Sequence, residues 1–245
     1  MVALDKRMMS LVDPVVAARA RDNVIIPLFS NRGFLPYVKN LLCSVDRVSV
    51  DNWMVLALDN ATCAPIAAGF GLVNQQPNSG QPCVYPYSHR PLTKSHVSKY
   101  RSKEFNRMVM QRPMWVRHLL RSGYSVLQCD LDIAWLKSPF ELFKASTLFA
   151  NADLLLQSES GHGHNAGFYF ARPTVATDVF MTRWIDDLIK LWGQRAFEEQ
   201  HSLGRALRQT KQNHSLGKLK VHLLCTLANL HTAGAHLLPP TLRAS

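Results

Sequence analysis

An apolar run that ends in two aspartates constrains this chain more than any other feature. The run Tyr124–Cys129 (YSVLQC) follows Gly123, a natural helix stop, and leads directly into Asp130 and Asp132. Its composition predicts a central buried strand. Residues two apart in an extended chain face the same side, so both carboxylates are expected to reach one cation.

Two carboxylates beside an apolar strand repel each other and lose solvation unless a cation neutralises them. Mg²⁺ and Mn²⁺ prefer oxygen ligands and often combine one or two carboxylates with substrate phosphates. A bare D-x-D pattern is common by chance. Its place after the most strand-like segment of the chain favours Asp130 and Asp132 as metal ligands.

Strand and helix patterns alternate along the chain, which predicts an α/β sheet covered by helices on both faces. The expected strands are residues 24–29, 53–58, 124–129, 153–157, 168–171 and 220–224. The expected helices are residues 34–45, 94–122, 174–192 and 196–209, with Pro113 starting a second helix inside 94–122 and residues 74–91 forming a loop. Residues 1–22 are assigned to an N-terminal extension with no visible signal peptide or membrane span, and residues 23–245 to one domain.

Two further segments carry polar groups. Gly161–Gly167 (GHGHNAG) precedes the strand at 168–171, and its glycines allow close backbone approach to a ligand, while Asn165 offers a donor and an acceptor. A polar loop without a ligand explains this segment equally well. The segment Glu198–Gln200 lies in a helical stretch, where a solvent-exposed helix face is the simpler interpretation.

The net charge of +11 favours anionic partners, which include nucleic acid and phosphate-bearing small molecules. Basic residues recur through 90–121 and again through 190–220. Aromatic residues are not interleaved with the first basic run and no nucleic-acid motif is present, so nucleic acid is not expected as a partner. No two of the five cysteines have C-x-x-C spacing, which leaves a zinc ribbon unsupported.

Together these segments resemble the nucleotide-diphospho-sugar transferases of plants and algae, the group that includes extensin arabinosyltransferases and rhamnogalacturonan xylosyltransferases. The stretch from Leu119 to Pro139 resembles the family's Gly-Tyr, apolar strand, Asp-x-Asp, Trp-Leu and nearby Pro, and Asn165–Pro173 resembles its Asn-[Ser/Thr]-Gly-Phe-Tyr segment. The resemblance covers about residue 23 to about residue 224. Glu199-Gln200 matches an Asp-Gln pair more loosely, and Gly204 stands where the family has Asn.

The resemblance implies a GT-A fold with a mostly parallel central sheet, and a manganese-dependent (or magnesium-dependent), retaining transfer from a UDP-sugar to a glycan or glycoprotein. It implies that Asp130 and Asp132 bind the metal and that these two residues, Asn165, Ala166, Gly167 and Gln200 bind the donor. It also implies cell-wall synthesis in the Golgi lumen. A C-terminal family segment with a last metal ligand is not recognised in this chain.

The sequence identifies no catalytic nucleophile or base, and the sugar and acceptor stay open. A GT-A protein that binds the donor without turnover, or a fragment of an enzyme, is the alternative to an active transferase. A basic nucleic-acid-binding protein is a more distant alternative.

Overall fold

The computed structural model describes residues 4–69, 81–87, 92, 96–99, 102–145, 147–159, 163–194, 198–212 and 219–224. Within these residues it forms a seven-stranded sheet in the order β3-β2-β1-β4-β6-β5-β7. The strands are β1 Val24–Ser30, β2 Trp53–Ala57, β3 Cys83–Val84, β4 Ser125–Cys129, β5 Leu154–Glu159, β6 Gly163–Ala171 and β7 Val221–Leu224. Strand β6 runs antiparallel to β4 and β5, and the other strand pairs are parallel. The predicted mostly parallel α/β sheet is confirmed.

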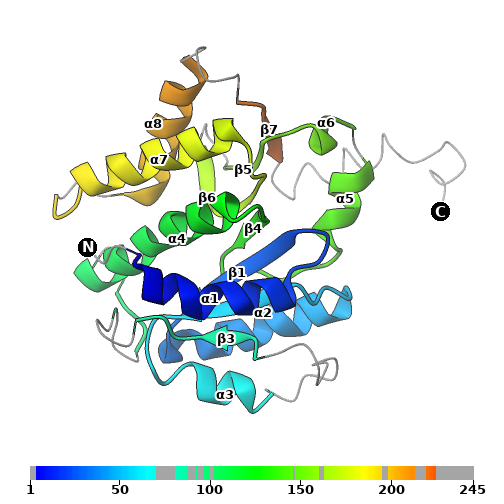
Figure 1. Cartoon of the computed structure of the whole chain (residues 1–245), viewed down its shortest axis with the longest axis vertical. Helices are drawn as coiled ribbons and strands as arrows, with labels where there is room; N and C mark the ends of the chain where they lie inside the picture. The colour runs from blue at the N-terminus through cyan, green and yellow to red at the C-terminus, as the bar shows by residue number, and fades with distance from the viewer. Residues whose placement is uncertain are drawn as a thin grey trace, which may run out of the picture.

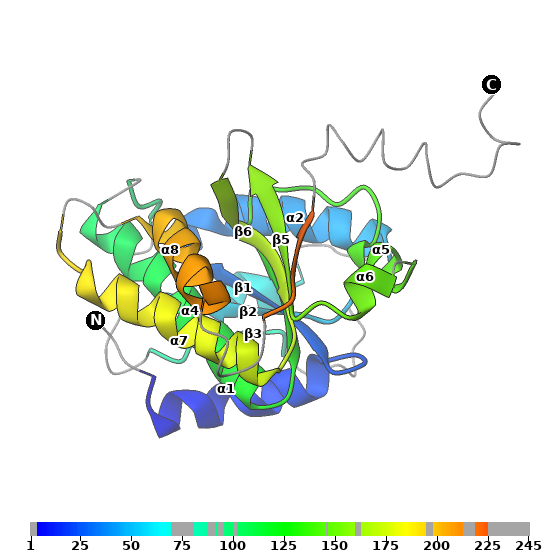
Figure 2. The same cartoon turned by 90° about the horizontal axis from the view of Figure 1, so that it is seen from above.

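Helices cover both faces of the sheet, as Figures 1 and 2 show. The larger hydrophobic cluster packs helices α1, α4, α7 and α8 against one face, and a second cluster packs α2, α3 and α5 against the other. The helices are α1 Lys6–Arg19, α2 Leu35–Arg47, α3 Cys63–Ala67, α4 Lys103–Arg121, α5 Pro139–Ala145, α6 Thr147–Ala150, α7 Val175–Lys190 and α8 Glu199–Gln212, with a short 3-10 turn, η1, at Arg32–Phe34.

Helix α1 lies in the segment that the sequence assigns to an extension, yet it packs into the domain. Its Met8, Val12 and Val16 are buried in the larger cluster. At its end, the Arg19 guanidinium donates to the backbone carbonyl of Trp53 at 3.1 Å and lies over the Trp53 ring. These contacts tie the first helix to β2.

Helix α4 continues through Pro113, so the prediction that a second helix starts there is wrong. A proline inside a helix costs about 3 kcal/mol through its missing N–H and its ring. Trp115 and Val116 are fully buried just beyond it, and burying each apolar side chain contributes about 1.5–3 kcal/mol. The burial of this face offsets the cost of the proline and keeps the helix whole.

Strand β6 begins at Gly163, whereas the sequence predicts a strand only from residue 168. The glycines at 163 and 167 weaken the strand signal, but pairing of Gly163 and His164 with β5 extends the strand beyond the residues that pair with β4, with an irregular register near Ser158. Gly161 and His162 lie outside the described residues. The segment Asn165–Gly167 is therefore strand rather than loop.

The strand order places a topological switch between β1 and β4. After β1 the chain continues to β2 on one side, and it later returns to form β4 on the other side. Because β1 and β4 are parallel, their carboxyl ends lie at the same end of the sheet. Ligands of open α/β sheets bind outside the carboxyl ends of strands at such a switch point. Asp130 directly follows β4 at this end of the sheet.

A disulfide joins Cys63 of α3 to Cys83 of β3, with their Cα atoms 5.3 Å apart. Cys43 and Cys129 are free thiols. None of the helices in the described ranges combines the length and the apolar character that a membrane crossing needs.

Candidate functional site

Asp130 and Asp132 lie at the carboxyl end of β4, and Leu131 and Asp132 form a turn there. The strand ends at Cys129, so the extended-chain argument for their common direction does not apply. Both acids are nevertheless close enough to Cys129 for their charges to affect its thiol. Burial raises the pKa of the Cys129 thiol, and the charges of Asp130 and Asp132 raise it further. The turn thus keeps both acids at the same end of the strand.

The side chains of Asp130 and Asn165 converge on Gly167. The backbone N–H of Asp130 donates to the carbonyl of Gly167 at 2.7 Å, and Asn165 Oδ1 accepts from the Gly167 N–H at 2.6 Å. A Cβ atom built on Gly167 would lie 2.1 Å from Asp130 Oδ2 and 3.0 Å from Asn165 Oδ1. The Asp130 carboxylate therefore rests on the glycine α-carbon, where any side chain would displace it.

The other two residues predicted to bind the donor lie differently. The side chain of Ala166 is buried in the larger hydrophobic cluster. Gln200 is partly buried in the first turn of α8, one residue after Glu199. It is Glu199 that the structure connects to Asp130, through a basic side chain from α4.

Arg112 of α4 forms ion pairs with both Asp130 and Glu199. Its Nη1 pairs with Asp130 Oδ1, and its Nη2 pairs with Glu199 Oε2. The Glu199 side chain is 9% exposed and the Arg112 side chain 15%, whereas that of Asp130 is 38% exposed. The guanidinium thus links a carboxylate inside the protein to a carboxylate at its surface.

Burial and ion pairing together shift the pKa values of Arg112 and Glu199. Burial lowers the pKa of Arg112, but Glu199 and Asp130 outweigh it and raise the pKa overall. Burial also raises the pKa of Glu199 to about 7, although Arg112 opposes the change. The Tyr169 hydroxyl and Glu199 Oε1 are buried and have no hydrogen-bond partner in the described parts of the chain. Arg112 is therefore the main positive charge that balances the Glu199 carboxylate.

Stability should depend on pH through Glu199. Its carboxyl has a raised pKa, so its contribution is fully present below about pH 4.5 and is lost as pH rises through about 7. We expect Glu199→Gln to remove this dependence, so that the wild type loses up to about 3 kcal/mol more stability than the variant over this range. Urea unfolding at about pH 5 and about pH 8 measures the difference.

The matched control is Glu141→Gln, because Glu141 is an exposed residue of α5. It should leave the pH dependence of the unfolding free energy as in the wild type. Parallel pH curves for the wild type and Glu199→Gln would show that Glu199 is not the group whose pKa is raised.

The donor set at the end of β4 fits a divalent cation that shares its coordination with a substrate. Among the residues that the structure describes, no group of three or more His, Cys, Asp or Glu side chains could enclose a metal. Two carboxylates completed by water and phosphate oxygens match the usual binding of Mg²⁺ and Mn²⁺ to nucleotide substrates. Asp130 and Asp132 could hold such an ion together with a phosphate-bearing ligand.

The sequence interpretation missed Arg112 and Glu199. It chose no residue from the basic run of α4, and it favoured a solvent-exposed helix face for residues 198–200, whereas Glu199 is buried. The sequence does contain a pattern that indicates burial of Arg112. Val109, Trp115 and Val116 stand at helical spacings of three or four from it, so the arginine lies in an apolar stripe. A similar signal was present in α8, because Leu203, Ala206 and Leu207 stand four, seven and eight positions after Glu199 and are buried.

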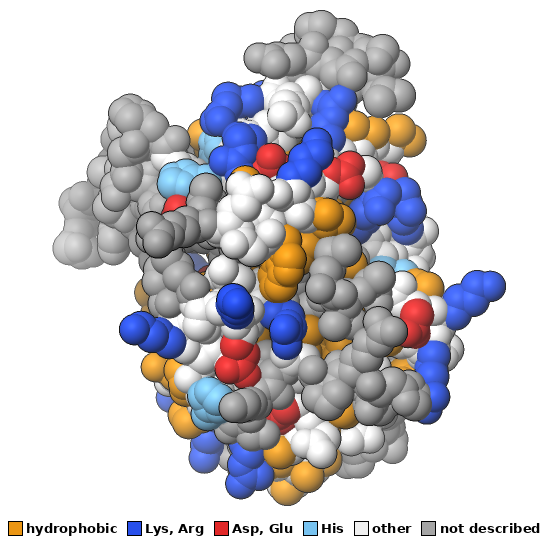
Figure 3. Space-filling view, turned by 90° about the vertical axis from the view of Figure 1, so that its left-hand side faces the viewer, with side chains coloured by type: hydrophobic (Ala, Val, Ile, Leu, Met, Phe, Trp, Pro, Cys, Tyr) orange, Lys and Arg blue, Asp and Glu red, His pale blue; other side chains and the backbone are white. Residues whose placement is uncertain are grey.

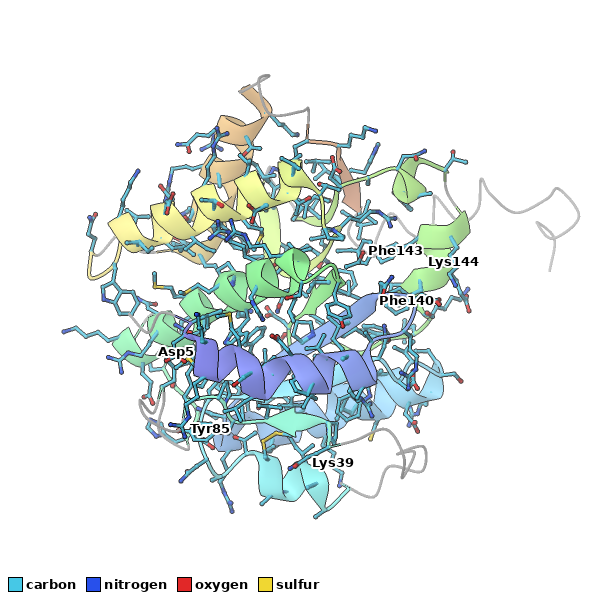
Figure 4. The ribbon with its side chains drawn as sticks, in the orientation of Figure 1. Asp5, Lys39, Tyr85, Phe140, Phe143 and Lys144 are labelled. Carbon is cyan, nitrogen blue, oxygen red and sulfur yellow. A yellow bond between two sulfur atoms is a disulfide. The ribbon has the colours of Figure 1, made fainter. Side chains whose placement is uncertain are left out.

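Aromatic side chains fix the chain that follows Asp132. The Trp135 ring meets Phe140 with centroids 6.4 Å apart, and Phe140 meets Phe143 at 6.0 Å. Phe143 in turn packs on Phe170 of β6 at 5.0 Å. Figure 4 shows Phe140 and Phe143 on the side of α5 that faces the domain. These contacts secure the turn that carries the two aspartates.

Several basic residues outside the site have acidic partners. Arg121 pairs with Asp178 at 2.7 Å, and Arg205 pairs with Asp187 at 2.6 Å. Figure 3 shows Lys and Arg side chains over the part of the molecule where α7 and α8 lie, with acidic side chains among them. These ion pairs neutralise part of the basic charge of α4 and α8.

Comparison with known proteins identifies the family of this chain. Residues 48–229 match the family model described as nucleotide-diphospho-sugar transferase. Three relatives come from Arabidopsis thaliana. Arabinosyltransferase XEG113 is 25% identical over 77% of this chain and 30% of its own length. UDP-D-xylose:L-fucose alpha-1,3-D-xylosyltransferase 3 is 24% identical over 84% of this chain and 54% of its own length.

Beta-arabinofuranosyltransferase RAY1 is 28% identical over 66% of this chain and 30% of its own length. The alignments therefore span about a third to a half of the length of these relatives. The family match itself covers well over half of the present chain and includes Asp130, Asp132, Asn165, Gly167 and Glu199. The chain belongs to the nucleotide-diphospho-sugar transferase family.

Proposed function

We propose that this chain is the catalytic domain of a glycosyltransferase that moves a sugar from a UDP-linked donor to a glycan or glycoprotein, with a divalent cation and with retention. One observation carries the proposal. Asp130 stands at the switch point of the sheet, beside Asp132 and against Gly167, in a chain of this family.

The names of the relatives support the reaction class. One is named for UDP-D-xylose as donor and L-fucose as acceptor, and two are named as arabinosyltransferases or arabinofuranosyltransferases. A sugar nucleotide as donor and a glycan as acceptor suit all of these reactions. The identity of the sugar differs among the relatives, so the proposal leaves it open.

The residues of this chain have distinct parts in the proposed reaction. Asp130 and Asp132 would hold the cation, Mn²⁺ or Mg²⁺, which supplies Lewis-acid charge at the leaving diphosphate when bound. Asn165 and the backbone of Ala166 and Gly167 form the neighbouring edge of the site and would orient the donor. Gln200 at the start of α8 would complete the donor site.

The Golgi lumen is the proposed location. Disulfides persist in oxidising compartments such as those of the secretory pathway and are rare in the cytosol, so the bond between Cys63 and Cys83 supports this placement. Mass spectrometry of the unreduced protein from its native source should find peptides joined through these two cysteines. Finding both as free thiols would contradict the placement.

A donor-binding protein without turnover is the second candidate. The departures from the family pattern in α8 favour it, because Glu199 and Gly204 stand where the family has Asp and Asn. Hydrolysis of UDP-sugars with manganese distinguishes the candidates. Release of free sugar supports the enzyme, and metal-dependent binding without release supports the binding protein.

A thermal-shift screen tests the proposal. Ligands that bind only the folded state raise the melting temperature. UDP and UDP-sugars should raise it when manganese is present and leave it unchanged when a chelator replaces the metal. A shift with other nucleotides but not with UDP would contradict the proposed donor class.

A further inference from the structure

Arg112 joins two carboxylates that differ in their surroundings. Glu199 stands at the first position of α8, where its backbone carbonyl accepts from Trp184 Nε1 at 3.2 Å. Both residues are buried, so this end of the ion-pair chain is fixed within the protein. Asp130 at the other end is more than a third exposed and can meet a ligand. Glu199 therefore acts as the anchor and Asp130 as the group that is held.

The contacts of Asp130 determine the orientation of its carboxylate. Oδ1 faces Arg112, Oδ2 lies against the α-carbon of Gly167, and the backbone N–H of Asp130 is bonded to the Gly167 carbonyl. The contacts on its two oxygens, together with the hydrogen-bonded backbone of Asp130, leave the carboxylate little freedom to rotate. A ligand preorganised in this way does not need to be ordered when the metal arrives.

The geometry of the guanidinium suits this task. Its planar fork offers separate N–H groups to two carboxylates at once and stays charged at any accessible pH. A lysine ammonium would keep the positive charge but lacks the fixed fork. Carboxylates that bind metals are usually held by such partners, and losing one typically costs 10–100-fold in metal affinity or activity.

We propose that Arg112 is a positioning residue, which Glu199 anchors and which holds Asp130 in the orientation that receives the metal and the donor diphosphate. The inference rests on the proposed function. It adds a residue of α4 and a residue of α8 to a site otherwise built from β4 and β6. Neither side chain need touch the donor.

The experiment compares Arg112→Lys and Arg112→Gln with the wild type, using manganese and UDP as the probe. Calorimetry gives the Kd of UDP at saturating manganese and the dependence of that Kd on manganese concentration. Both variants should need about 10–100-fold more manganese for half-maximal UDP binding. Arg112→Lys should fail to restore binding, since charge alone does not provide the fork.

Arg121→Gln is the matched control, because Arg121 belongs to the same helix and its ion pair with Asp178 is exposed. It should leave the manganese requirement within about two-fold of the wild type, as expected for surface ion pairs. The melting temperature of each variant without ligand is measured in parallel. A purely structural role for Arg112 would lower the melting temperature but leave the manganese requirement of the folded protein unchanged, and that result would overturn the inference.

A double-mutant cycle tests the anchor. Glu199→Gln should also raise the manganese requirement, and combining it with Arg112→Gln should add little, because the two residues act as one unit. Additive effects would overturn the role of Glu199 as anchor. Absence of manganese-dependent UDP binding in the wild type would refute the proposed function and this inference together, whereas equal manganese requirements in the wild type and Arg112→Lys would refute the inference alone.

Discussion

Replacing Gly167 by alanine is expected to weaken manganese-dependent UDP binding by about 100-fold while the domain stays folded. The new Cβ would lie 2.1 Å from Asp130 Oδ2, so the carboxylate must leave its place. The obstructing atom is the end of a side chain that is partly exposed, and overpacking of this kind costs about 1–3 kcal/mol of stability. Calorimetry with UDP and manganese measures the binding, and thermal melting measures the fold.

Gly204→Ala provides the control for this prediction. The nearest atom to a Cβ at Gly204 is Arg208 Nη1 at 3.7 Å, which is an ordinary contact. Alanine in a helix interior is favoured over glycine by about 1 kcal/mol, so this variant should melt at the same or a higher temperature and bind UDP as the wild type does. Wild-type binding by Gly167→Ala would show that the position of Asp130 does not govern metal binding.

Asp132→Asn is expected to reduce manganese-dependent UDP binding by on the order of 100-fold, the upper end of the loss caused by removing a partner of a metal ligand. The substitution removes a charged ligand and keeps nearly the same shape. Asp132 is exposed in its turn, so the melting temperature should not change. UDP titrations over a range of manganese concentrations measure the effect.

Asp130→Asn distinguishes the role of Asp130 from that of Asp132. It should weaken binding similarly, but it also removes the partner of Arg112 and therefore should lower the melting temperature, which Asp132→Asn should not. Binding by Asp132→Asn that equals the wild type would exclude this carboxylate as a metal ligand.

Local patterns were sufficient to predict the central strand and the acids that follow it. Strand β4 carries an uninterrupted apolar run, and burial of Val126, Leu127 and Cys129 follows directly from it. The approach of Asn165 and Gly167 to Asp130 depends on pairing between β4 and β6. The family pattern implied that these residues share a site, but the antiparallel register that brings them together is a property of the sheet.

The Arg112 ion pairs could not be predicted in the same way, because they depend on how α4 and α8 pack against β6. Charged residues in a helix usually face solvent, and the cost of burying Glu199 is met only by a partner 87 positions away in sequence. The direction of the Asp132 side chain could not be predicted from strand periodicity either. The chain turns immediately after Cys129, so the alternation of an extended strand stops there.

Calorimetric titration of the wild-type protein with UDP, first with manganese and then with excess chelator, tests the central claim most directly. Asp130 and Asp132 bring negative charge to the place where a diphosphate would bind, and a divalent cation between them reverses the sign of that interaction. UDP should therefore bind with manganese and show no heat of binding when the chelator is present. Equal affinity in both conditions would contradict a metal bridge between the aspartates and the donor.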